Sequence, residues 1–183
     1  RLRRSLHGTD YGGRDFGTAC LQKEGRQIAR LLPPDQGVGP ARSAREAKSQ
    51  VGPSFGNNFN NRTEEAIGSA LDLWTAYRER AYLSSPQPFL GYFFMLEDRA
   101  ASNRPVKVKE PHFKVFPEFV GASYMRRYEI FCRKLVLERH YTVAAFISST
   151  IEEGLQGSFS TPAADLSVEH FAKTLTAHLA AFA

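Results

Sequence analysis

The chain is predicted to fold as an α/β domain with a central mixed sheet flanked by helices. Two nearly continuous apolar runs, residues 89–96 and 142–148, have the length and side chains of strands buried on both faces. Amphipathic patterns at residues 63–83, 123–140 and 167–182 predict helices between and after these runs. Helices that alternate with buried strands indicate an α/β fold.

Composition is typical of a soluble globular protein. The 183 residues suit one domain, with 42% hydrophobic and 23% charged residues. No apolar run is long enough to cross a membrane and no signal segment opens the chain, so we expect a cytoplasmic protein without a membrane partner. Cys20 and Cys132 form no CxxC motif, which argues against a disulfide framework or a zinc site. The first residue is Arg rather than Met, which indicates a fragment or a processed chain.

Positive charge is concentrated in the first third of the chain. Residues 1–62 hold 11 Lys or Arg against 5 Asp or Glu, whereas residues 63–183 hold 13 against 14. A basic bias favours a polyanion as the partner. The alternative is a solvated face or a disordered basic arm.

The chain divides into an irregular basic N-terminal segment, residues 1–44, and a domain core, residues 45–183. The first segment is rich in Arg and Gly, and only a short helix at about residues 21–32 is expected there, ended by Pro33-Pro34. A short strand follows at about residues 45–50, and Gly52-Pro53 ends it.

The first long helix is predicted to follow an Asn-rich loop. Asn61 is the expected N-cap and Glu64 its capping-box partner, so the helix covers residues 63–83. Apolar residues at helical spacing predict the buried stripe: Ile67, Ala70, Leu71, Trp74, Tyr77 and Ala81.

Residues 99–122 are polar and interrupted by Pro, and are predicted to run over the surface. The next helix is expected to bury one stripe: Tyr124, Tyr128, Phe131, Cys132 and Leu135. The closing helix uses Val168, Phe171, Leu175 and Leu179.

Glu46-Ala47-Lys48 is the candidate catalytic motif. Residues i and i+2 of a strand point to the same face, so Glu46 and Lys48 project together, and Gln50 can share that face. Asp35 lies upstream, with ten residues between it and Glu46. Two carboxylates and a Lys suit metal-assisted hydrolysis of a phosphodiester, since Mg²⁺ takes oxygen ligands and lowers the pKa of a bound water. The alternative is a turn Asp and a surface ion pair.

The Asn-rich stretch suits contact with DNA. Asn57, Asn58, Asn60 and Asn61 surround Phe59 and precede Arg62. Asn pairs with adenine in the major groove, and Arg with guanine or phosphate. The alternative is a turn followed by a helix cap. Motifs of P-loop, α/β-hydrolase and zinc-protease sites are absent from the sequence, and no His is predicted to bind a metal.

Three segments resemble the XhoI-type restriction endonucleases of the PD-(D/E)xK nuclease superfamily. They are KSQVGPSFGNNFNNRTEEAIG, then LDLWTAYRE, then PEF-GASY-RYE-CRKLV-ER, and the likeness extends from about Glu46 to Ser149. The resemblance implies a Mg²⁺-dependent homodimeric enzyme that cuts double-stranded DNA within a palindrome, CTCGAG for this family, alongside a companion DNA methyltransferase.

The resemblance also implies roles for single residues. Glu46 and Lys48 match the family's ExK motif, Asp35 and Glu46 would bind Mg²⁺, and Lys48 would orient the attacking water. The residues expected to contact DNA are Gln50, Asn57, Asn58, Asn60, Asn61, Arg62, Lys107 and Lys109.

The chain departs from the family upstream of Glu46. The family carries an apolar strand with a Trp-Asp pair there, whereas this chain has Leu31-Leu32-Pro33-Pro34-Asp35. A frameshifted or truncated N-terminal part would explain the difference. Two other functions therefore stay open, a DNA-binding remnant without catalysis and a repair or recombination nuclease on the same scaffold.

Overall fold

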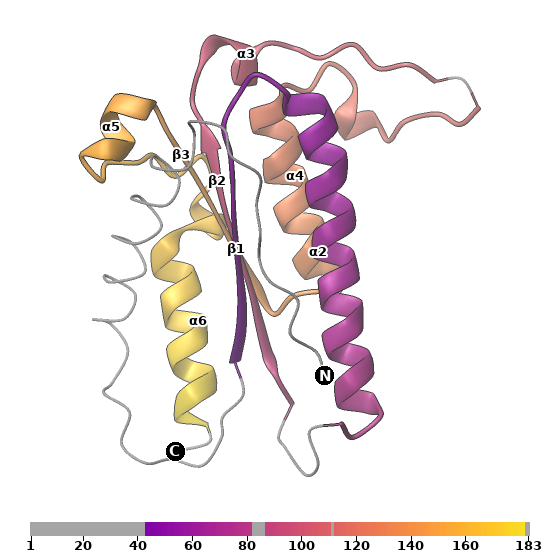
Figure 1. Ribbon diagram of the computed structural model, residues 1–183, viewed down its shortest axis with the longest axis vertical. Coiled ribbons are helices and arrows are strands. Elements are labelled where there is room, and N and C mark those ends of the chain that lie inside the picture. Colours follow the sequence, from indigo (N-terminus) through magenta and orange to yellow (C-terminus); the bar gives the residue numbers. More distant parts are fainter. Residues whose placement is uncertain (1–42, 82–86, 111, 182–183) are drawn as a thin grey trace, which may run out of the picture.

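The computed structural model describes residues 43–81, 87–110 and 112–181, which form three layers (Figure 1). The middle layer is a three-stranded sheet in the order β1-β2-β3, with β1 at Ser43–Gln50, β2 at Phe89–Glu97 and β3 at Val143–Ser149. These strands are all parallel, where the sequence predicts a mixed sheet. The reason is the connections, because each pair of neighbouring strands is joined through a long helix that returns the chain to the same end.

Two helices cover one face of the sheet and one helix covers the other. α2 (Phe55–Arg78) and α4 (Tyr124–Leu137) lie on the first face and α6 (Val168–Ala180) on the second (Figure 1). The side chains of β2 and β3 alternate between two cores. On the α2/α4 side they are Leu90, Tyr92, Phe94, Leu96, Ala144 and Phe146. On the α6 side they are Phe89, Phe93, Met95, Val143, Ala145 and Ile147.

The two apolar runs form strands buried on both faces, as predicted. All nine residues of β2 and all seven of β3 are buried. Parallel strands covered by helices on both sides lose the polar alternation of a half-exposed strand, which is why their sequences are almost continuously apolar.

Helix α2 begins earlier than predicted. Its first residue is Phe55 and Ser54 is its N-cap, so the Asn-rich stretch is the first two turns of a helix and not a loop. Asn61 and Glu64 therefore do not form the predicted capping box. Phe55 stacks on Tyr124, and Phe59, one turn later, meets Tyr128 edge-on. Burial of these two aromatic rings outweighs the low helix propensity of Asn.

The buried stripe of α2 agrees with the predicted one at Ala70 and at Trp74, which packs against the core, but differs from it at other positions. Ile67 and Leu71 are 36% and 55% exposed, whereas Ala66 and Ala70 are fully buried. Ala81, the last residue of the predicted stripe, is exposed beyond the end of the helix. The stripe continues from Phe59 through the two alanines, whose small side chains let the helix backbone approach the sheet.

The other long helices follow the predicted patterns. Ser123 caps α4 by accepting a hydrogen bond from the Arg126 amide, and Ser167 caps α6 in the same way. α4 buries Tyr128, Phe131, Cys132 and Leu135, and α6 buries Val168, Phe171 and Leu175. Cys132 is a free thiol. No helix in the described ranges combines the length and apolar character that crossing a membrane requires.

Short elements fill the connections. They are α3 (Ala100–Asn103), η1 (Pro117–Phe119), α5 (Ile151–Leu155) and η2 (Ala164–Leu166). α5 follows β3 directly, and a capping box between Thr150 and Glu153 starts it. The segment between α3 and α4, which is predicted to run over the surface, projects from the body of the protein (Figure 1). It carries the exposed rings of Phe113 and Phe116.

Gly91 in the central strand is required by the packing of α6. A Cβ atom there would lie 2.5 Å from the ring of Phe171, which is only 1% exposed. We expect Gly91→Ala to lower the free energy of unfolding by about 1–3 kcal/mol through overpacking.

The matched control is Gly68→Ala, because nothing lies within 4 Å of a Cβ atom at that helical position. This variant should be neutral or stabilised by up to about 1 kcal/mol. Urea unfolding followed by circular dichroism measures both, and equal stability of the two variants would contradict the packing argument.

Candidate active site

Strand β1 places Glu46, Lys48 and Gln50 on the face covered by α2 and α4. Their partners in the parallel register are Tyr92, Phe94 and Leu96, which belong to the core on that side. Lys48 Nζ lies 3.3 Å from Glu46 Oε1. The strand alternation thus brings the carboxylate and the ammonium together, as the sequence predicts.

The Glu46 carboxylate is held from a second side by Tyr141. The phenol donates a hydrogen bond of 2.5 Å to Glu46 Oε2, and its oxygen lies 3.0 Å from the carbonyl oxygen of Ala66 in α2. Burial, aided by the bond to Glu46, raises the pKa of Tyr141 above its usual range. The phenol therefore stays protonated and acts as a donor, so each oxygen of Glu46 has its own partner.

Lys48 contacts a second carboxylate, Glu65 of α2, at 3.2 Å. The same oxygen of Glu65 accepts a hydrogen bond of 2.7 Å from Arg62. Burial acts to raise the pKa of Glu65, but the hydrogen bonds from Arg62 and Lys48 outweigh it and the pKa is lowered. Glu65 is therefore ionised at neutral pH, and Lys48 lies between two acidic side chains from different elements.

Gln50, which is predicted to contact DNA, is buried at the end of β1. It is 2% exposed, its amide oxygen accepts a hydrogen bond from the Tyr128 hydroxyl, and its amide nitrogen donates to the Ser54 carbonyl at 3.4 Å. The side chain joins the end of β1 to the start of α2 and to α4. Both ends of its amide are used inside the protein, and its contact with DNA stays a prediction.

The Asn residues lie on the first two turns of α2. Asn57, Asn60 and Asn61 are exposed and Asn58 is half-buried. Arg62 is half-buried on the same helix, and among the described residues its Nε atom is buried without a hydrogen-bond partner.

The two lysines expected at the DNA backbone lie elsewhere. Lys107 and Lys109 are exposed on the segment between α3 and η1. Residues 99–127, which include this segment, carry seven Lys or Arg and two Asp or Glu. Asp35 lies outside the described residues.

A cavity of about 430 Å³ opens beside the motif. Its walls come from β1, α2, the start of β2 and Tyr141, through Ala44, Arg45, Glu46, Ala47, Lys48, Ser69, Leu73, Leu90 and Tyr141. Glu65 and Tyr141 are the site residues that sequence reasoning missed. Neither has a local signal in the sequence, because one lies 17 and the other 93 positions after Lys48 and only the fold brings them to it.

The donors at this site suit a hard cation. Glu46 and Glu65 offer carboxylate oxygens. A complete cluster of three or more His, Cys, Asp or Glu that could bind a metal is, however, absent from the described residues. Mg²⁺ is commonly bound by one or two carboxylates together with water and substrate phosphate, so Glu46 fits such a role. A carboxylate that binds a cation, with an ammonium beside it, can promote hydrolysis of a phosphodiester, because the cation and the ammonium both stabilise negative charge on the phosphate.

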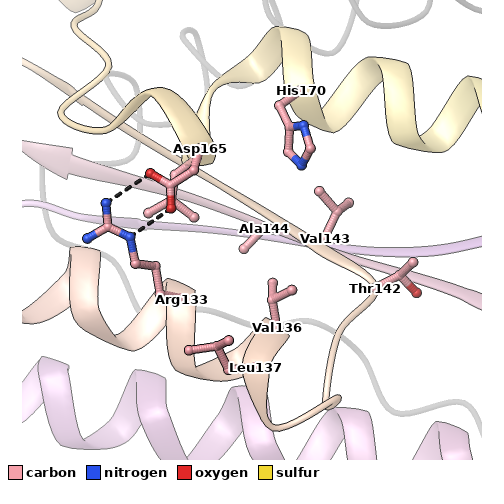
Figure 2. Close-up of a pocket in the computed structure, with 9 residues that line it drawn as sticks. Arg133, Val136, Leu137, Thr142, Val143, Ala144, Asp165 and His170 are labelled. Carbon is pink, nitrogen blue, oxygen red and sulfur yellow. Dashed lines mark hydrogen bonds and ion pairs between the residues drawn. The ribbon is translucent and has the colours of Figure 1, made fainter.

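A second cavity, of about 260 Å³, lies at the opposite edge of the sheet (Figure 2). Arg133 and Asp165 are joined at one side of it by two hydrogen bonds of 2.7 and 2.9 Å (Figure 2). The hydrogen bond from Arg133 lowers the pKa of Asp165, so this pair is a stable ion pair. The cavity contains none of the predicted site residues.

The fold and the ExK strand define an α/β protein with a site suited to phosphate chemistry, and the comparisons with known proteins specify its family. The family model described as restriction endonuclease XhoI matches residues 38–161. The chain belongs to this restriction endonuclease family. The match includes the strand with Glu46 and Lys48, the whole of α2, and the sheet.

Three relatives are curated as type II restriction enzymes. BstVI of Geobacillus stearothermophilus is 54% identical over 146 residues, which are 80% of this chain and 65% of the relative. XhoI of Xanthomonas vasicola is 57% identical over 96 residues, 52% of this chain and 39% of the relative. AbrI of Azospirillum brasilense is 62% identical over 72 residues, 39% of this chain and 32% of the relative. The chain thus spans less than two thirds of each, and no solved structure matches it.

The buried hydrogen bond between Tyr128 and Gln50 gives a test of the site's framework. Tyr128→Phe leaves the buried Gln50 oxygen without its donor, so we expect a loss of about 1–3 kcal/mol in the free energy of unfolding. The double variant Tyr128→Phe with Gln50→Leu removes both polar partners and should recover part of that loss. Chemical denaturation of the two variants checks this, and a double variant that is no more stable than Tyr128→Phe would contradict the coupling.

Proposed function

We propose that this chain is the catalytic part of a type II restriction endonuclease that hydrolyses double-stranded DNA within a palindrome, CTCGAG by resemblance. The observation that carries the proposal is the Glu46–Lys48 pair on β1, inside the segment that the family model matches. The names of the three relatives support the reaction class. We infer that the α/β domain is a PD-(D/E)xK nuclease core.

In this proposal Glu46 is a Mg²⁺ ligand, with Asp35 as the second. The cation, when bound, stabilises negative charge on the phosphate and makes a coordinated water more acidic. Tyr141 holds the Glu46 carboxylate in a fixed orientation through its hydroxyl. A fixed ligand reduces the reorganisation needed when the reaction begins.

Lys48 would act on the water and on the reacting phosphate. Its ammonium is a donor beside Glu46, so it can orient the attacking water and stabilise the developing anion. The water oxygen bonds to phosphorus in line with the 3′-oxygen, and the phosphorus–O3′ bond breaks. The products are a 5′-phosphate and a 3′-hydroxyl.

The DNA would lie across the end of the sheet where the strands finish. The first turns of α2, with exposed Asn57, Asn60 and Asn61, and the projecting segment between α3 and α4 lie at this same end (Figure 1). The basic composition of residues 99–127 suits the DNA backbone, and Asn side chains suit base edges. Arg62, Lys107 and Lys109 are further proposed contacts, with half-buried Asn58.

A palindromic site calls for two copies of the chain related by a two-fold axis, so we propose a homodimer. A companion DNA methyltransferase and a bacterial cytoplasmic location complete the proposal, as expected for a restriction–modification system.

Catalysis is tested with Lys48→Ala and Glu46→Ala. Both variants should lose cleavage of plasmid DNA bearing CTCGAG by at least about 100-fold in the presence of Mg²⁺, because each lacks a group that acts in the transition state. Glu64→Gln, a change at an exposed position of α2, is the control and should cut normally. Unchanged cutting by Lys48→Ala would refute the mechanism.

The same assay separates the alternatives. Binding to CTCGAG in a gel shift without cleavage in either Mg²⁺ or Mn²⁺ would identify a DNA-binding protein without catalysis. Cleavage at random sites would identify a nuclease of repair or recombination.

Contact of Lys107 and Lys109 with the DNA backbone is tested by the salt dependence of DNA binding. Lys107→Ala and Lys109→Ala should each weaken DNA binding at every sequence. Each should also reduce the size of the negative slope of log K, the logarithm of the DNA association constant, against log salt by about one. Lys173→Ala, exposed on α6, is the matched control and should leave the slope unchanged. A filter-binding titration at several salt concentrations gives these slopes, and an unaltered slope for both loop variants would exclude the contacts.

A further inference from the structure

We propose that Glu65 is a positioning residue that holds the Lys48 ammonium in place for catalysis. The proposal rests on the function proposed above, in which Lys48 acts on the water and the phosphate. Glu65 would add a third charged side chain to the Glu46–Lys48 pair of the ExK motif, and it comes from α2 rather than from β1.

The geometry connects two elements that pack together. Lys48 Nζ on β1 lies 3.2 Å from Glu65 Oε2 on α2 and 3.3 Å from Glu46 Oε1 on its own strand. Arg62, one turn before Glu65, binds the same carboxylate oxygen at 2.7 Å. The hydrogen bond from Arg62 limits the rotamers of Glu65, so the carboxylate that receives Lys48 is itself fixed.

The need for a second carboxylate follows from the charges. Once Glu46 serves a cation, its attraction for Lys48 is weakened, and the cation repels the ammonium beside it. Without another anion, Lys48 would turn away into solvent. Glu65 contacts Lys48 from α2 and can keep its ammonium within reach of the site while Glu46 binds the metal.

The competing explanation is an ordinary surface ion pair. The Glu65 side chain is 44% exposed and that of Lys48 26%, and pairs with such exposure contribute little to stability. The two explanations differ in what they predict for catalysis. A surface pair can be removed without kinetic effect, whereas loss of a positioning residue lowers the rate of the chemical step.

Glu65→Gln is the informative variant and Glu64→Gln its matched control. Both variants lose one negative charge from the same turn of α2. The side chain of Glu64, however, is exposed and makes no hydrogen bond or ion pair within the described residues. Any general effect of charge on DNA affinity is therefore shared by the two variants.

Single-turnover cleavage at saturating DNA and Mg²⁺ is the first measurement. We expect Glu65→Gln to cut about 10- to 100-fold more slowly than Glu64→Gln, as a displaced catalytic group does, with equal dissociation constants for DNA measured in Ca²⁺. Equal cleavage rates for the two variants would overturn the proposal. An effect that disappears at higher Mg²⁺ concentration would also overturn it, because that result identifies Glu65 as a metal ligand.

A double-mutant cycle separates positioning from a structural role. In a Lys48→Ala background, Glu65→Gln should cause no further loss of the residual rate in Mn²⁺, because there is no ammonium left to hold. A further loss equal to that seen with Lys48 present would show that Glu65 acts through the fold or the metal, and would overturn the proposal.

The environment of the Lys48 ammonium can be measured by NMR, which does not require the protein to cut DNA. The ¹⁵Nζ ammonium signal of Lys48, assigned by its loss in Lys48→Ala, should shift or broaden in Glu65→Gln and stay in place in Glu64→Gln. If the wild-type chain does not cut DNA, the proposed function fails and this signal alone decides whether Glu65 holds Lys48. An identical signal in the two variants would overturn the proposal in either case.

Discussion

The structure depends on how the protein pairs a row of polar side chains on an otherwise apolar face. β1 contributes Glu46, Lys48 and Gln50 to the side of the sheet where β2 contributes Tyr92, Phe94 and Leu96. Polar groups partly or fully removed from water require partners. Each of the three has a partner on this face: Tyr141, in the connection before β3, for Glu46, Glu65 of α2 for Lys48 and Tyr128 of α4 for Gln50. The site is therefore formed by the same contacts that attach α2 and α4 to the sheet.

This arrangement explains which parts of the fold could be predicted from the sequence. β2 and β3 are apolar along their whole length because helices cover both sides, and that pattern is visible in the residues alone. α4 and α6 show a regular apolar stripe and start at a serine cap. The pairing of Glu46 with Lys48 depends only on alternation along one strand, so it too could be predicted.

The predictions from the sequence were wrong or incomplete where residues distant in the sequence determine the local structure. The first turns of α2 have the composition of a loop, and only the stacking of Phe55 and Phe59 on residues of α4 makes them helical. Ala66 marks the buried side of α2 less clearly than Ile67 and Leu71, because a helix that packs closely on a sheet buries small residues. Glu65 and Tyr141 could not be assigned to the site, since nothing near them in the sequence refers to β1. Family resemblance supplied the reaction class instead, and the comparisons confirmed the family.

Under the proposed function, the continuity of α2 has a consequence for how the DNA specificity of the protein can change. One uninterrupted helix carries the exposed Asn residues at its start and Glu65 two turns further on. A rigid rod transmits a tilt at one end to the other, so a substitution that adjusts the first turns toward a different base sequence also moves the carboxylate beside Lys48. Readout of the DNA and the rate of cleavage are then traits that evolution or a protein engineer must adjust together, and new specificity would have to be accompanied by compensating changes where α2 meets the sheet.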